Sequence, residues 1–191
     1  MTKYKRILLK LSGESLMGEQ NYGIDQKRLI EYAEQIAELI GSEEAWSIAG
    51  TTFMSGLSSS DAMLKEAYTQ KAIQALENAI SLEPENVEYR VNLSLAHTEN
   101  PPPNEPMKGI QMLLSLNEKH PEDVMVLTTL ARLAIKTGQF DRAQTRLESA
   151  LAINPEHPSA TCLLATVLEQ TGDMTRAQEL RNKCELLTLK E

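Results

Sequence analysis

The stretch "VMVLTTLARLAIKTGQFDRAQTRLESALAINPEH", residues 124–157, holds two apolar stripes separated by a glycine. In the first half, apolar residues recur every three or four positions, which is typical of one face of a helix: Leu127, Leu130, Ala131 and Ala134. Gly138 predicts the end of that helix. A second stripe follows, with Asp141 near its start, where a carboxylate suits the helix dipole: Phe140, Ala143, Leu147 and Ala150. The stretch therefore predicts two helices joined by a tight turn.

The same arrangement recurs along the chain. Pro155 follows the second stripe, and Pro84 and Pro121 stand in the same context, at separations of 37 and 34 residues. A two-helix unit of about 34 residues is typical of stacked repeats, in which neighbouring units bury a shared core. We therefore predict an N-terminal segment, 1–40, and a repeat region, 41–191, with four units at about 43–86, 87–123, 124–157 and 158–191.

A further motif is found at the start of the first unit. Trp46, Ala49, Gly50 and Phe53 follow the spacing W-x2-L-G-x2-Y, with alanine for leucine and phenylalanine for tyrosine. With the common phase of alanine, glycine and proline, residues 43–191 resemble the tetratricopeptide repeat family. The resemblance implies an all-α superhelix of antiparallel helix pairs.

Two units depart from this pattern. The first unit has about ten additional residues, either between its helices or in its second helix. The second unit has "ENPPPNEP", residues 99–106, at its inter-helix turn. Three successive prolines favour a stiff polyproline extension, which would be a spacer or a protruding recognition element.

The N-terminal segment has a different character. "KRILLKLSGESLMG", residues 5–18, followed by the helix-like residues 26–40, resembles the start of bacterial uridylate kinase, of the amino-acid kinase family, over about 40 residues. The resemblance implies that Lys10, Ser12 and Gly13 lie at the phosphates of a nucleotide. The segment 1–40 would be a natural fusion, a mispredicted start or an engineered leader.

Phosphoryl transfer needs several converging segments, and no second glycine-rich phosphate loop follows Ile40. We therefore predict no enzymatic activity. We expect "RILLKL" to be an isolated strand and residues 1–24 to be loosely packed or paired with another copy of the chain. Residues 26–40 should form a helix that caps the repeats, with one apolar stripe on the first repeat helix: Leu29, Ala33, Ile36 and Ile40.

Composition limits the function further. The chain has 191 residues, is 41% hydrophobic and carries a net charge of −8, all of it beyond residue 40. An acidic chain without a basic stripe argues against a nucleic-acid partner. Cys162 and Cys184 suggest no disulfide framework, so we expect two buried thiols and a cytoplasmic location. No apolar run reaches the length of a membrane span, and no cofactor or metal site is expected.

The function predicted from these repeats is protein binding in a concave groove. The first helix of each unit should form its wall through the second, fifth, ninth and twelfth positions. The predicted wall residues of units two to four, with Asn92 added, are Glu88, Val91, Asn92, Leu95, Thr98, Met125, Thr128, Arg132, Ile135, Ser159, Cys162, Thr166 and Glu169. A peptide or partner helix is the expected ligand. Alternatives are a nucleotide-binding kinase fragment, which the argument above predicts to be inactive, and a structural repeat that self-associates, for instance through the N-terminal segment.

Overall fold

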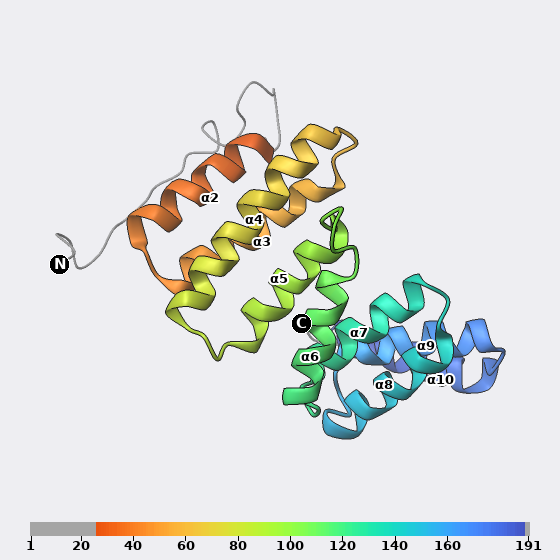
Figure 1. Cartoon of the computed structure of the whole chain (residues 1–191). Helices are drawn as coiled ribbons and strands as arrows, with labels where there is room; N and C mark the ends of the chain where they lie inside the picture. The colour runs from red at the N-terminus through yellow and green to blue at the C-terminus, as the bar shows by residue number, and fades with distance from the viewer. Residues whose placement is uncertain (1–25, 190–191) are drawn as a thin grey trace. The chain divides into compact units, whose positions relative to one another are not determined.

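A computed structural model describes residues 26–189, and every regular element in that range is helical. The elements are α2 (Gln26–Ile40), α3 (Glu43–Ser55), the 3₁₀ turn η1 (Gly56–Ser58), α4 (Ala62–Leu82), α5 (Val87–Glu99), α6 (Lys108–Lys119), α7 (Val124–Lys136), α8 (Phe140–Ile153), α9 (Pro158–Thr171) and α10 (Met174–Thr188) (Figure 1). The all-α prediction is confirmed. The predicted strand "RILLKL" lies outside the described residues.

The chain divides into two compact units, the first ending at Ile110 and the second beginning at Gln111, inside α6. In the first unit, α3 packs against α4, and α4 against α5. In the second unit, α7 packs against α8, α8 against α9 and α9 against α10. Helices that are neighbours in sequence are therefore neighbours in space, as in a helical repeat.

Most helices begin at a side chain that accepts a backbone hydrogen bond from the first turn. The capping residues are Ser42, Asp61, Asn86, Asp123, His157 and Asp173. Such caps pair the backbone N–H groups that a helix leaves without partners. At α9 the acceptor is Nδ1 of His157, 3.1 Å from the amide nitrogen of Ala160, so the neutral ring carries its proton on Nε2. Gly138, with φ +73°, follows the end of α7 as predicted.

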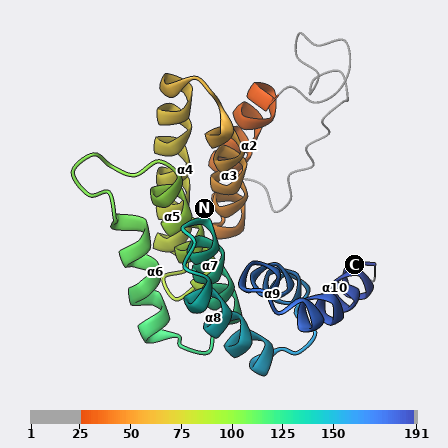
Figure 2. The same cartoon turned by 90° about the vertical axis from the view of Figure 1, so that its right-hand side faces the viewer.

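In the first unit, α2, α3 and α4 lie side by side (Figure 2). Phe53 and Leu76 are fully buried in the core of this unit. The additional residues of the first repeat form η1 and lengthen α4 to 21 residues, compared with 14 in α8. Of the two options left open by the sequence, the longer second helix accounts for most of the insertion.

The helix predicted over residues 26–40 is present as α2, and it packs on α3. Its fully covered residues are Ile30 and Ala37. The predicted stripe is only partly covered, because Leu29 and Ile40 are 37% and 47% exposed. The sequence period identified an apolar face correctly but placed its centre about one residue away from the buried line.

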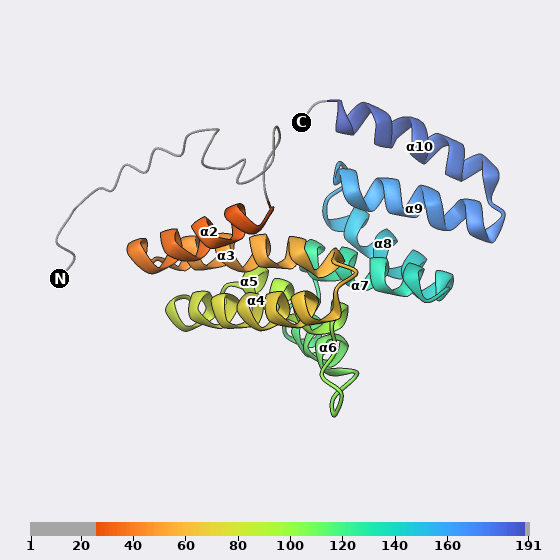
Figure 3. The ribbon, with the colours of Figure 1, turned by 90° about the horizontal axis from the view of Figure 1, so that it is seen from above.

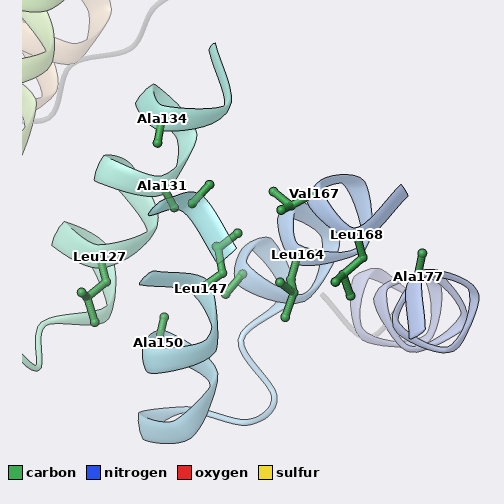
Figure 4. Close-up of a cluster of buried hydrophobic side chains, with 11 residues drawn as sticks. Leu127, Ala131, Ala134, Leu147, Ala150, Leu164, Val167, Leu168 and Ala177 are labelled. Carbon is green, nitrogen blue, oxygen red and sulfur yellow. The ribbon is translucent and has the colours of Figure 1, made fainter. Parts of the chain in front are cut away.

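In the second unit, one cluster of buried side chains joins α7, α8, α9 and α10 (Figure 4). Its members are Leu127, Ala131, Ala134, Ala143, Leu147, Ala150, Ala160, Leu164, Val167, Leu168 and Ala177. Five alanines on α7, α8 and α9 allow close approach of the helices, and the leucines fill the space between them. Both apolar stripes quoted from residues 124–157 contribute to this core.

The two cysteines form a disulfide bond, contrary to the prediction of two free thiols. Cys162 of α9 and Cys184 of α10 are 22 residues apart in sequence, with a Cα–Cα distance of 5.1 Å. The helices run side by side (Figure 3), so residues in different helices of one hairpin meet. The expected cytoplasmic location rests on unpaired cysteines, so the disulfide removes that support for it.

The proline-rich connection between α5 and α6 turns back on itself instead of forming an extended segment. The amide of Glu105 donates to the carbonyl of Pro102 at 3.0 Å, and that of Lys108 to the carbonyl of Glu105 at 3.0 Å. Two successive turns therefore replace the predicted polyproline extension, since Asn104 and Glu105 follow the prolines and permit turn formation.

Candidate functional site

The first helices of the two repeats in the second unit, α7 and α9, are in contact. Arg132 of α7 is exposed, and its Nη2 donates to Oγ of Ser159 on α9 at 3.3 Å. Among the described residues, no carboxylate is paired with Arg132. Met125, 41% exposed, lies on the same helix. We call Met125, Arg132, Ser159 and Thr166 the α7/α9 wall.

Two of the predicted wall residues on α7 belong to the core. Thr128 is buried, and its hydroxyl donates to the carbonyl of Val124 at 2.7 Å. Ile135 is partly buried and packs against the cluster of the second unit. Their side chains support the helix, so the accessible chemistry of α7 comes from Met125 and Arg132.

On α9, two predicted wall residues are bonded to α10. Cys162 is disulfide-bonded to Cys184, and Glu169 accepts from Nε of Arg181 at 2.8 Å. Thr166 lies between them and donates to the carbonyl of Cys162 at 3.2 Å. Sequence reasoning could not assign these partners, because no signal along the chain specifies which face of α10 meets α9.

In the first unit, α5 carries the predicted wall residues of the second repeat. Glu88 is exposed, and Asn92 and Leu95 are half-buried. Val91 is 2% exposed and belongs to the core of that unit. The available chemistry on α5 is one carboxylate, one amide and one partly covered leucine.

A buried histidine lies near the end of the same helix. His97 is 5% exposed, and its Nδ1 has no hydrogen-bond partner among the described residues. Burial lowers the pKa of His97, with a smaller contribution from the positive charge of Lys108, while Glu77 and Glu105 act in the opposite direction. The sequence signalled only a histidine on a helix, which is as common in a core as in a site.

The proposed nucleotide residues Lys10, Ser12 and Gly13 lie outside the described residues. Within residues 26–189 there is no cluster of three or more histidine, cysteine, aspartate or glutamate side chains that could hold a metal ion. Over that same range, no helix has the length and apolarity needed to cross a membrane.

Residues 128–181 match a family model described as "Tetratricopeptide repeat". The predicted resemblance to this family is confirmed. Among solved structures, "Crystal structure of MamA" aligns with 87% of this chain and 90% of that chain, at a TM-score of 0.55 and 17% identity. "MamA 41-end from Desulfovibrio magneticus RS-1" aligns with 87% of each chain, at a TM-score of 0.54 and 14% identity. At these identities the alignments support a shared helical-repeat fold.

The resemblance to uridylate kinase is also confirmed. The uridylate kinase of Bacteroides thetaiotaomicron is 62% identical over 60 residues, which are 30% of this chain and 25% of the kinase. The chain therefore spans a quarter of the length of that relative. The repeat fold supports a protein-interaction scaffold.

Proposed function

We propose that the chain binds a peptide or a partner helix through the α7/α9 wall. The hydrogen bond from Arg132 to Ser159 supports this proposal most directly, because it holds a cation at the junction of two first helices. An exposed guanidinium without a carboxylate partner can bind a carboxylate or a backbone carbonyl of a ligand. Met125, seven residues earlier on α7, supplies a flexible apolar contact.

The ligand is expected to be short and of mixed chemistry. A clamp for a C-terminal carboxylate needs several basic and amide groups, and the predicted wall provides only Asn92 and Arg132 toward such a set. One cation, a methionine and two hydroxyl side chains instead suit an extended segment or one face of a helix.

The full chain is the bait for the test, and a protein that it captures is titrated against variants. Arg132→Glu should weaken the affinity by about tenfold or more, because it places a carboxylate where the ligand meets a cation. The free energy of unfolding should change by less than about 1 kcal/mol, since the side chain is exposed. Arg142→Glu is the matched control, an exposed arginine on α8 of the same unit. Equal affinity of wild type and Arg132→Glu would place the binding surface elsewhere.

The kinase match favours a second candidate, a nucleotide-binding fragment. The aligned part is a quarter of the kinase, and phosphoryl transfer depends on groups from several segments. A thermal shift of the full chain with ATP, GTP, UTP or UMP would support this candidate, and flat melting curves with all four would exclude it. Concentration-dependent light scattering distinguishes the third candidate, a self-associating repeat.

A further inference from the structure

An open apolar groove runs between α2 and α3 in the first unit. Leu29, Ala33, Ile36 and Ile40 of α2 and Ala45 and Ile48 of α3 line it, and we call it the α2/α3 groove. Its volume is about 430 Å³. Ile48 is 57% exposed, which is unusual for a large aliphatic side chain facing a neighbouring helix.

The second unit shows what covers the equivalent face of another first helix. Counted from the start of each helix, Ile48 and Thr52 of α3 correspond to Leu163 and Val167 of α9. Val167 is fully buried, and Leu163 packs against the same cluster. In this unit α7, α8 and α10 all lie against α9.

In the first unit only half of this arrangement is present. α2 packs on α3 as α8 packs on α9. Within residues 26–110, however, no helix takes the place that α7 has in the second unit. The groove is therefore apolar and open where one more helix could pack on α3.

The sequence that forms the two groove helices is acidic, and one carboxylate, Glu44, lines the groove. Between residues 28 and 60 there is one basic residue, Arg28, and five carboxylates: Glu31, Glu34, Glu38, Glu43 and Glu44. Glu31 is paired with Arg28 and Glu34 with Lys71, whereas Glu44 lines the groove itself. A second copy that docked through the same face would bring like charges together, whereas a basic segment would be attracted.

We propose that the α2/α3 groove binds an amphipathic helix of a partner protein, with basic residues flanking its apolar stripe. α7 gives the expected stripe, because it contributes one large and two small residues to the core of the second unit, Leu127, Ala131 and Ala134. The partner helix places its stripe on Ile48 and Ile40, and its lysine or arginine side chains reach Glu44. This surface is separate from the α7/α9 wall, and the proposal does not rest on ligand binding there.

The probes are two labelled synthetic helices of about 18 residues with the same leucine and alanine stripe at i, i+4 and i+7. One carries lysines on its polar face and the other glutamates. Fluorescence anisotropy with the full chain should show that the lysine helix binds and that the glutamate helix is at least about tenfold weaker. No binding of the lysine helix at about 100 μM, or equal binding of both, would overturn the proposal.

Two variants separate groove binding from general attraction to an acidic protein. Ile48→Glu should weaken binding of the lysine helix by at least about tenfold, although it adds a negative charge. Met63→Glu adds the same charge on α4, where the side chain is 84% exposed and outside the groove, and should change the affinity by less than about twofold. Stronger binding to Ile48→Glu, or equal effects of the two variants, would mean non-specific attraction and refute the proposal.

A separate experiment tests whether a second copy of the chain occupies the α2/α3 groove. Light scattering of wild type and Ile48→Glu should give the same mass over a wide concentration range. A dimer of the wild type that Ile48→Glu dissociates would assign the groove to self-association and overturn the partner helix. Circular dichroism of each variant checks that the helical fold is retained.

Discussion

Replacing Gly109 by alanine tests a close contact between α5 and α6 in the first unit. Gly109 lies at the start of α6, and a Cβ there would be 2.3 Å from the carbonyl oxygen of Ser94, 2.3 Å from Oγ1 of Thr98 and 2.7 Å from the amide nitrogen of Thr98. Because a carbon normally stays about 3.5 Å from such atoms, the start of α6 has to move by about 1.2 Å.

Two opposing effects decide the sign of the change. Overpacking of this kind costs about 1–3 kcal/mol. Alanine in place of glycine favours a helix by at most about 1 kcal/mol, and less in the first turn. Since two of the three close atoms belong to the backbone of α5, they cannot rotate away. We expect Gly109→Ala to lower the free energy of unfolding by about 1–2 kcal/mol.

Urea unfolding followed by circular dichroism measures the effect, with an expected fall in the midpoint of about 0.5–1 M. Gln111→Ala, at an exposed position of the same helix, is the control and should change the midpoint little. Thr98→Ala combined with Gly109→Ala should recover only part of the loss, because the carbonyl of Ser94 remains. An unchanged or higher midpoint for Gly109→Ala would refute the reasoning.

Reduction of the Cys162–Cys184 disulfide should lower the free energy of unfolding of the second unit by about 3.4 kcal/mol, from closure of a loop of 22 residues. Thiol titration under denaturing conditions checks the bond, and two free thiols without reductant would contradict it. Burial lowers the pKa of His97, so the unfolded chain takes up its proton first. The contribution of His97 to the free energy of unfolding should therefore be complete above the ordinary histidine pKa of about 6.5 and should fall as the pH drops below that value. His97→Gln should flatten this part of the plot of urea midpoint against pH. Ala143→Leu should cost about 1–3 kcal/mol, because Ala143 is fully buried between helices, and an unchanged midpoint would contradict the packing.

The sequence predicted the helices well because each is specified locally. The stripes of residues 124–157, the cap at Asp123 and the turn at Gly138 are all signals within one helix or its end. The disulfide escaped prediction because the pairing of Cys162 with Cys184 depends on the rotation of α10 about its own axis. Two cysteines 22 residues apart contain no information about that rotation.

The predicted groove wall stays a prediction, but two of its members are not accessible to a ligand. The repeat period assigned Thr128 and Val91 to a groove wall, but both are buried, because a first helix in these units is covered on more than one side. Ile48 was not singled out, since an isoleucine in a helix usually belongs to the core. Only the missing cover on α3 within the described residues distinguishes it.

The disulfide also determines how far the chain can be stretched. A pulling force on the two ends of an unfolded chain would extend the 22-residue separation between Cys162 and Cys184 to about 75 Å if the bond were absent. With the bond intact, the two residues stay within the reach of a single covalent bridge, and the α9–α10 hairpin adds almost nothing to the contour length. Force spectroscopy would thus report oxidised and reduced molecules as chains of different length, even after every helix has unfolded.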